Sequence, residues 1–451
     1  MKTLRFPFFP FYDRVGMERY LERMAKKGWM LEHMGNYIWT FTACTPKQVH
    51  FTVSYYSKGS AFDPELTEGQ KMLEELCSHG GWKLMDSQAE IMVFASEEEN
   101  PIPIHTESAT ELDQLEKSST KYIFGWGVVL FIILVQLLMS IQNLRSNPVP
   151  FLASTLSLVC GITLPLLGIV IVLELLIWFY WRKKARMAVE QEEPLPPVRG
   201  CAFLEKIILM LFMMGIVWGL LEENQPGVRF NILLVLFAIV FLNLAVNGAR
   251  LFMKKRKASK EKNMAVTLIV DVVMATFLTA ILCWSGMQDS SNEMVPADDE
   301  LILTAEELCG VPQPGATLES QYEGSVLITH IQGWDIGDAD IPKEDRASLS
   351  YEIVDADTRF VYDWIFQWMS HRYDHYVDYE EWDETSELRY VYTPADAEPW
   401  DAEAVWRLKK GDEPTDIYLI CWDDRILELE TGWELSESQI EVAAAKFKPN
   451  R

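Results

Sequence analysis

Five long apolar runs dominate the middle of the chain. They cover residues 122–141, 157–181, 203–221, 230–249 and 265–286. Each run has the roughly 20 residues of helix that a bilayer requires, and almost no polar face interrupts them. Because the buried core helices of a soluble protein would not follow one another five times with almost no polar face, the pattern predicts a multi-pass α-helical membrane protein with five spans in residues 122–286.

The second run starts well before its span. Apolar residues begin at Val149 and continue to Trp181, which is too short for two spans and a turn. The run contains Pro165, and a proline inside a helix kinks it. We therefore expect one span that is kinked at Pro165 and preceded by an interfacial stretch.

The charges of the loops predict the orientation. Basic residues gather in the loop between spans two and three and in the loop between spans four and five, at Arg182, Lys183, Lys184, Arg186, Arg199 and Lys206, and at Arg250, Lys254, Lys255, Arg256, Lys257, Lys260 and Lys262. Lys and Arg are retained on the cytoplasmic side. This places the amino terminus inside, and five spans then place residues 287–451 outside a plasma membrane.

Residues 1–96 predict a compact cytoplasmic α/β domain. Extended segments are expected at 3–9, 29–31, 37–43, 49–56 and 90–94, and helices at 13–27 and 68–79. Thr67 and Gln70 have the spacing of a capping box at the start of the second helix. A polar linker, 97–121, leads to the first span.

This domain contains an internal repeat. Gly28-Trp29 and Gly81-Trp82 each follow a helix and precede a strand, and the flanking residues match as well. Two such copies predict a βαββαβ, ferredoxin-like α+β arrangement. The Gly-Trp pairs suit a structural role, in which glycine reverses the chain and tryptophan seals the helix to the sheet. A role of the two tryptophans in gripping a ligand is the alternative.

The same residues carry a family resemblance. The segments FPFFPFYD and AKKGWML, the aromatic strands and the second Gly-Trp resemble the DUF2812 family of bacterial membrane proteins, whose amino-terminal domain precedes several spans. The family has no assigned activity and no assigned catalytic residues. Similar proteins are often encoded near PadR-type transcriptional regulators, which implies envelope regulation.

Beyond the last span, a polar stalk at 287–300 precedes a second soluble domain, 301–451. Strands are expected at 324–331, 349–354, 404–409, 417–422 and 426–429, and helices at 358–373 and 437–447, the latter started by a capping box of Ser436 and Gln439. We expect an α+β domain with helices on one face of an antiparallel sheet. Pairing of Cys309 with Cys421 is left open.

Charge distinguishes this outer domain from the rest. The 451-residue chain has a net charge of -26, and residues 287–451 alone hold 39 acidic and 12 basic side chains. Such a surface repels nucleic acid and attracts a cationic peptide or a divalent cation. In its densest part, His371 and His375 would share a helix face with Asp374 and Asp378 near them, which makes these four a candidate metal site beside the plainer interpretation of a solvated acidic face.

Polar residues also occur inside the spans. Glu174 interrupts span two and Asp271 span five, while Asn243, Asn247 and Arg250 follow one another along span four. Ionisable groups in a membrane normally face the bundle interior. They predict either a proton or ion relay or hydrogen-bonded contacts between helices.

Known catalytic signatures are missing from the sequence, including HExxH, GxSxG, Walker and kinase motifs. We therefore expect a non-enzymatic protein without a cofactor. A soluble domain on each side of the bilayer suits an envelope sensor, regulatory or interaction protein whose residues 1–96 contact a cytosolic protein. The alternative is a small-solute or proton-coupled transporter, or its accessory subunit, that uses Glu174 and Asp271.

Overall fold

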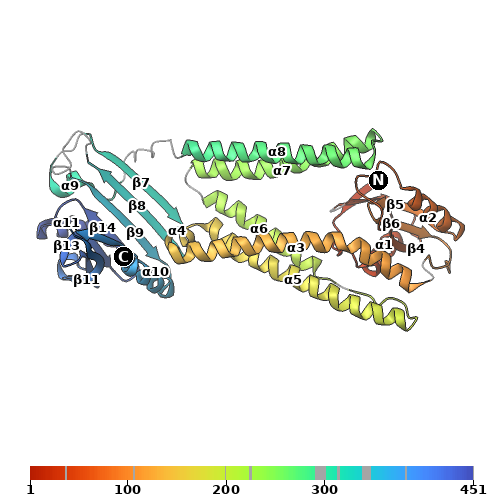
Figure 1. Cartoon of the computed structure of the whole chain (residues 1–451), viewed down its shortest axis with the longest axis horizontal. Coiled ribbons are helices and arrows are strands. Elements are labelled where there is room, and N and C mark those ends of the chain that lie inside the picture. The colour runs from red at the N-terminus through yellow and green to blue at the C-terminus, as the bar shows by residue number, and fades with distance from the viewer. Residues whose placement is uncertain are drawn as a thin grey trace. The chain divides into compact units, whose positions relative to one another are not determined.

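The structure is a computed structural model that describes residues 1–35, 38–104, 107–198, 200–222, 226–289, 301–311, 315–337, 347–380 and 383–449. Its contacts divide the chain into two compact units. The first comprises Met1–Leu137, Ile162–Met213 and Leu233–Leu282, and the second Leu138–Gly161, Met214–Ile232 and Cys283–Arg451. Each unit therefore combines segments of long helices with one β-rich domain (Figure 1).

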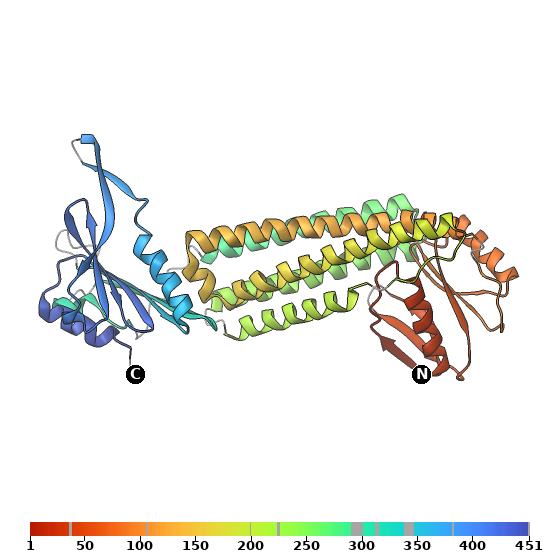
Figure 2. The same ribbon diagram turned by 90° about the horizontal axis from the view of Figure 1, so that it is seen from below.

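The N-terminal domain of the first unit consists of two copies of one β-α-β-β motif. The first copy contains β1 (Lys2–Arg5), α1 (Arg14–Lys26), β2 (Trp29–Met34) and β3 (Trp39–Ala43), and the second contains β4 (His50–Tyr55), α2 (Glu68–His79), β5 (Lys83–Gln88) and β6 (Ile91–Ser96). Each copy forms its own antiparallel three-stranded sheet, in the orders β1-β3-β2 and β4-β6-β5. Figure 2 shows α1 lying along the strands of this domain.

Backbone details confirm the repeat. Gly28 and Gly81 have φ values of +81° and +78°, in the region where glycine avoids the penalty of a side chain. The β2–β3 and β5–β6 hairpins each contain a register shift two or three residues after the Gly-Trp pair, at Leu31/His33 and Leu84/Asp86. The capping box of Thr67 and Gln70 is also present.

The structure does not confirm the ferredoxin-like arrangement, because that fold has one four-stranded sheet. Here the last strand of each copy pairs with both other strands of the same copy, so the two copies form separate sheets. The sequence interpretation lacked β5, whose residues KLMDSQ show no clear alternation of apolar and polar side chains.

Long helices form the rest of the first unit. They are α3 (Ser108–Ser146), α5 (Thr155–Glu190), α6 (Ala202–Glu222), α7 (Pro226–Lys255) and α8 (Lys260–Asp289). Among the described residues, four segments are long and apolar enough to cross a membrane: Ser108–Ser146, Thr155–Glu190, Ala202–Leu221 and Leu233–Lys255. The fifth predicted span lies in α8, whose side chains at 278 and 281–289 are outside the described ones, so five spans remain a prediction.

Within the predicted linker, α3 begins at Ser108 and continues into the first predicted span. The stretch before the second span is a separate short helix, α4 (Pro148–Ala153). Pro165 lies inside α5.

The second unit contains the C-terminal domain, an eight-stranded antiparallel sheet. Its strands are β7 (Thr317–Gly324), β8 (Ile328–Ile336), β9 (Leu349–Ala356), β10 (Val377–Glu380), β11 (Asp383–Ala395), β12 (Ala404–Lys410), β13 (Glu413–Cys421) and β14 (Arg425–Thr431), in the order β10-β11-β12-β13-β14-β9-β8-β7. The predicted meander of β12, β13 and β14 is confirmed. The predicted strand at 324–331 instead spans the turn between β7 and β8.

Helices cover both faces of this sheet, and the expectation of one covered face was wrong. α9 (Ala305–Cys309) and α11 (Glu437–Phe447) pack on a cluster with Ile353, Ile420 and Leu427. α10 (Arg359–His371) and α4 pack on a cluster with the alternate residues Val354, Leu419 and Ile426. Strands buried on both faces are apolar without alternation, and residues 418–421 and 426–429 are buried without interruption.

Specific contacts fix α4 and the end of α3 to the C-terminal domain. The Ser325 hydroxyl donates to the Leu152 carbonyl at 2.6 Å, and the Trp368 indole donates to the Ser146 carbonyl at 3.2 Å. A 3-10 turn, η1 (Glu398–Trp400), precedes β12. Cys309 and Cys421 are not joined in a disulfide.

Candidate functional site

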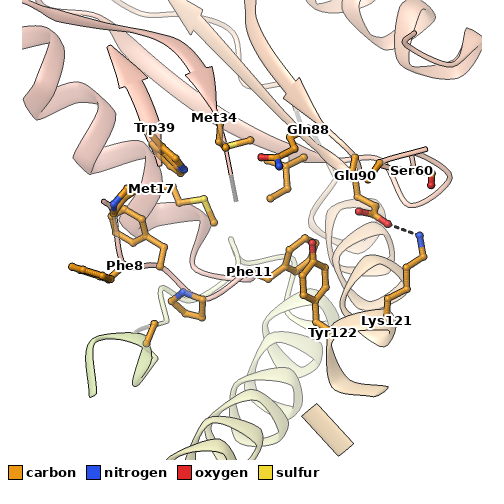
Figure 3. Close-up of a pocket in the computed structure, with 18 of the residues that line it drawn as sticks. Phe8, Phe11, Met17, Met34, Trp39, Ser60, Gln88, Glu90, Lys121 and Tyr122 are labelled. Atoms are coloured by element: carbon orange, nitrogen blue, oxygen red, sulfur yellow. Dashed lines mark hydrogen bonds and ion pairs between the residues drawn. The ribbon is translucent and has the colours of Figure 1, made fainter. Parts of the chain in front are cut away.

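A cavity of about 970 Å³ lies in the first unit, between the N-terminal domain and the ends of the long helices. Residues from both copies of the β-α-β-β motif line it, among them Trp39, Gln88 and Glu90 (Figure 3). Tyr122 and Trp126 of α3 and residues of α5, α6, α7 and α8 complete the wall. Its walls therefore come from elements that are far apart in the sequence.

The segment from Phe6 to Phe11 forms one wall of this cavity. The extended segment was predicted to run to residue 9, but β1 ends at Arg5, and Pro7 and Pro10 lack the N–H groups that continued sheet pairing requires. The ring of Phe11 stacks on Tyr122 with a centroid distance of 4.0 Å. Phe6 and Phe8 are 60% and 44% exposed, so part of this aromatic wall is not covered by protein.

Basic side chains line the same cavity near the helix ends. Lys121 forms an ion pair with Glu90, which Figure 3 shows as a dashed line. Lys206, Arg250 and Lys260 also belong to the lining, and Lys206 lies 3.7 Å from Glu205. The cavity thus has aromatic walls and several cationic groups.

Buried Glu174 joins the N-terminal domain to α5. One carboxylate oxygen accepts from the Tyr12 hydroxyl at 2.7 Å, and the other accepts from the backbone N–H of Cys201 at 2.5 Å. Burial, together with the bond to Glu174, raises the pKa of Tyr12. The phenol therefore stays protonated and donates a hydrogen bond to the carboxylate. A Cβ atom at Gly200 would lie 2.2 Å from Glu174 Oε1 and 2.7 Å from Pro10 Cγ, so this approach requires glycine.

A second connection joins α3 to α5. The Glu116 carboxylate accepts from Arg182 at 2.8 Å and from Arg186 at 2.9 Å, with both oxygens engaged each time. The hydrogen bond from Arg182, reinforced by Arg186, lowers the pKa of Glu116 to about 2. Both connections lie within the first unit.

α8 and the turn before it are joined to the same domain. The side-chain amide of Asn263 donates to the Phe62 carbonyl at 2.9 Å, and Lys257 pairs with Glu65 at 2.6 Å. Phe62 and Met264 line the cavity, so these bonds fix part of its wall.

The other predicted intramembrane residues lie apart from the Tyr12–Glu174 contact. The amides of Asn243 and Asn247 are exposed and donate to carbonyls of their own helix, at 2.9 and 2.8 Å. Asp271 is exposed on α8. Arg250 donates to Asn247 at 2.9 Å and lines the cavity, as Glu174 does.

The two Gly-Trp pairs contribute to packing. The Trp82 indole is buried and donates to the Ile102 carbonyl at 2.7 Å. Trp29 packs against the main core of the unit. The described lining of the cavity includes neither tryptophan, which favours their structural role.

The candidate metal residues in the second unit lack the predicted helical geometry. α10 ends at His371, so His375 lies beyond the helix and the two histidines do not share a helix face. His371, Asp374 and His375 are exposed, and the Asp378 side chain lies outside the described ones. Within the described parts of the chain, no three His, Cys, Asp or Glu side chains are grouped as a metal site would require.

A buried polar network lies beside these residues and escaped the sequence analysis. Arg372 pairs with Glu352 at 2.6 Å and with Glu428. His330 contacts Glu352 at 2.9 Å, and the Tyr392 hydroxyl donates to Glu428 at 2.7 Å. Burial opposes ionisation of Glu352, but His330 and Arg372 outweigh it and lower its pKa to about 2. Burial raises the pKa of Glu428.

Comparison with known proteins gives one match. Residues 15–126 match the family model described as "Protein of unknown function (DUF2812)". The matched segment runs from α1 to Trp126 of α3 and includes Glu116, Lys121 and Tyr122, but begins after Tyr12. No curated protein and no solved structure matches the chain.

Proposed function

We propose that the whole chain, of which residues 15–126 match the DUF2812 family model, is a non-enzymatic membrane sensor or regulatory protein. In this proposal the N-terminal domain is cytoplasmic and the acidic C-terminal domain is extracellular, at a plasma membrane. Four helices that are long and apolar enough to cross a membrane support the membrane assignment.

One observation carries the proposal: each β-rich domain is joined by specific side-chain contacts to α3 and α5. In the first unit, Glu174 of α5 accepts from Tyr12, and Lys121 of α3 pairs with Glu90. In the second unit, Ser146 at the end of α3 accepts from Trp368, and Leu158 of α5 packs on the core that includes α10. Because a helix is a stiff rod, a shift imposed at one end is transmitted to the other.

The ligand of the outer domain follows from its charge. With 39 acidic and 12 basic residues in 287–451, the domain attracts cations, and we propose a cationic peptide or a divalent cation as its ligand. The cytoplasmic output would be a change in the surface that residues 1–96 present to a cytosolic protein.

Hydrogen exchange on the full chain in nanodiscs of neutral lipid tests this function. Addition of an oligolysine peptide, or of Ca²⁺, should change exchange in the C-terminal domain and also in residues 1–35 and 107–126. Raising the salt concentration should suppress both changes, because the attraction is electrostatic. Binding that leaves the N-terminal domain unchanged would contradict the coupling.

A matched variant separates coupling from binding. Glu116→Gln weakens the α3–α5 connection and lies far along the chain from the acidic domain. It should keep the response of the C-terminal domain and reduce the response of residues 1–35. The control is Asp113→Asn, one turn earlier on α3, whose carboxylate is exposed and pairs only with Lys117 among the described contacts.

The transporter alternative requires Glu174 and Asp271 to serve one path. Glu174 is buried and accepts two hydrogen bonds, whereas Asp271 is exposed on α8. These contacts suit a structural joint better than a proton carrier. Proton-coupled uptake into vesicles that Glu174→Gln abolishes, with normal amounts of folded protein, would favour transport instead.

A further inference from the structure

We propose that the cavity beside the N-terminal domain binds an anionic lipid from the cytoplasmic leaflet. The head group would lie against Lys206, Arg250 and Lys260, and the apolar chain along the aromatic wall that begins at Phe6. The claim of binding rests on the cavity and on the membrane placement given under the proposed function. A regulatory role of the lipid rests on the proposed function. In that role, a bound lipid would change the strength of the contacts between the N-terminal domain and the long helices.

Size is the first argument. At about 970 Å³ the cavity is at the upper end of the range of about 300–1,000 Å³ that ligand pockets cover. A single inorganic ion would leave most of it empty. An occupant with an extended apolar part fits the volume.

The aromatic wall is the second argument. Phe8, Phe11, Trp39 and Tyr122 line the cavity, and Figure 3 shows their rings around its interior. Phe8 remains 44% exposed and Phe6 60% exposed. Apolar surface left in water is unfavourable, so covering these rings with an acyl chain stabilises the complex.

Charge selects the head group. Of the acidic residues in the lining, Glu90 is paired with Lys121, and Glu174 accepts from Tyr12 and Cys201. Glu205 lies beside Lys206. Arg250 lies in the last part of α7 and Lys260 begins α8, and residues 250–262 contain seven basic side chains and one acidic one. The net field at this end of the cavity therefore favours an anion.

Position selects a lipid over a soluble anion. Lys121, Arg250 and Lys260 each lie next to one end of a predicted span, at 122–141, 230–249 and 265–286. Basic residues in this position lie at the level of the lipid head groups on the cytoplasmic side. A lipid can thus enter from the bilayer with its head group already at the depth of the cationic side chains.

Lipid retention measured by native mass spectrometry tests the proposal. The full chain is reconstituted with equal amounts of phosphatidylglycerol and phosphatidylcholine of identical chains, and then transferred to a neutral detergent. We expect one phosphatidylglycerol molecule to be retained and phosphatidylcholine to be lost. The triple variant Lys206→Gln, Arg250→Gln, Lys260→Gln should lower retention by about 100-fold, because each basic group near a membrane surface contributes about 1 kcal/mol.

Two further variants make the result specific. The control triple variant Lys27→Gln, Lys183→Gln, Lys184→Gln removes the same charge from exposed positions outside the cavity lining and should retain the lipid. Ala61→Trp keeps every charge and fills space in the lining, so it should release the lipid. Both must keep the wild-type thermal unfolding temperature of the lipid-free protein to count as folded.

Three outcomes would overturn the proposal. Equal loss of lipid in both triple variants would mean that overall charge, and not the cavity, holds it. Equal retention of phosphatidylcholine would exclude selection of an anionic head group. If inorganic phosphate raises the thermal unfolding temperature as much as phosphatidylglycerol does, the site binds a free anion and not a lipid. A failure of the sensor function appears separately, in the hydrogen-exchange response to the outer ligand.

Discussion

The hydroxyl of Tyr12 lies 2.7 Å from Oε1 of Glu174, although the two residues are 162 positions apart. Tyr12 is 2% exposed and Glu174 4% exposed, so the bond forms away from water. A buried carboxylate needs hydrogen-bond donors, and Tyr12 together with the Cys201 N–H supplies them. This contact fixes the segment that lines the cavity to the second predicted span.

Removing the Tyr12 hydroxyl should loosen this connection. In Tyr12→Phe the buried carboxylate loses one donor, which costs about 1–3 kcal/mol. Hydrogen exchange of residues 1–35 in the full chain should become faster by the factor to which this free energy corresponds. Tyr180→Phe is the control, because Tyr180 lies on α5, as Glu174 does, and its side chain is 73% exposed. Equal effects of the two substitutions would argue against the Tyr12–Glu174 contact.

A methyl group at residue 200 should have a similar effect by a different route. In Gly200→Ala the new Cβ would collide with Glu174 Oε1 and Pro10 Cγ, so either the carboxylate leaves its two donors or the cavity wall moves. We expect a loss of about 1–3 kcal/mol. Gly127→Ala in α3 meets nothing within 4 Å and should leave stability unchanged or slightly higher. Thermal unfolding of both variants in the same detergent checks the difference.

Arg372 should be indispensable to the C-terminal domain. In Arg372→Leu, the partly buried carboxylate of Glu352 and the buried one of Glu428 would lose their shared cation, and breaking a buried ion pair costs about 3–5 kcal/mol. Near-ultraviolet circular dichroism and limited proteolysis should report partial unfolding. Arg359→Leu, at the start of the helix that ends just before Arg372, removes a 62% exposed guanidinium and should cost less than about 1 kcal/mol.

Acid should weaken the same network through Glu352. Its pKa is lowered from 4.5 to about 2, so its contribution is complete above pH 4.5 and is lost as the pH falls toward 2. A shift of this size corresponds to about 3 kcal/mol at neutral pH. Glu428 acts in the opposite direction, because its raised pKa favours the protonated form and lowers stability as the pH rises.

Glu352→Gln isolates the first effect. The variant should be less stable than wild type at pH 7, and its stability should change less between pH 4.5 and 2. Urea unfolding followed by tryptophan fluorescence measures both quantities. Glu441→Gln, at an exposed position of α11, should keep the wild-type pH profile. A wild-type profile that is flat in this window would contradict the assigned role of Glu352.

Local patterns predicted much of the fold. The capping boxes at Thr67 and Ser436 and the glycine at residue 81 act within a few residues of themselves, so the sequence reveals them directly. The apolar runs likewise need no partner to be recognised. By contrast, β5 and the 13-residue β11 contain many polar residues, and their pairing decides their conformation.

The candidate site was much harder to predict, because its contacts join distant residues. Glu174 was recognised as a costly intramembrane group, but nothing near it in the sequence points to Tyr12. The FPFFPFYD segment was interpreted only as part of an extended stretch and as a family resemblance, and not as the wall of a cavity. Its two prolines among aromatic residues were a usable signal, since they prevent regular pairing and leave the rings to form a wall. Arg372 bonds to residues 20 and 56 positions away.

The central claim is that the two β-rich domains lie on opposite sides of one membrane, and reporter fusions in intact cells test it most directly. A phosphatase that is active only outside the cytosol and a fluorescent protein that matures only inside it are each joined to residue 451. We expect an active phosphatase and a dark fluorescent protein there, with the reverse at residue 1. A bright fluorescent protein and a silent phosphatase at residue 451 would contradict the account.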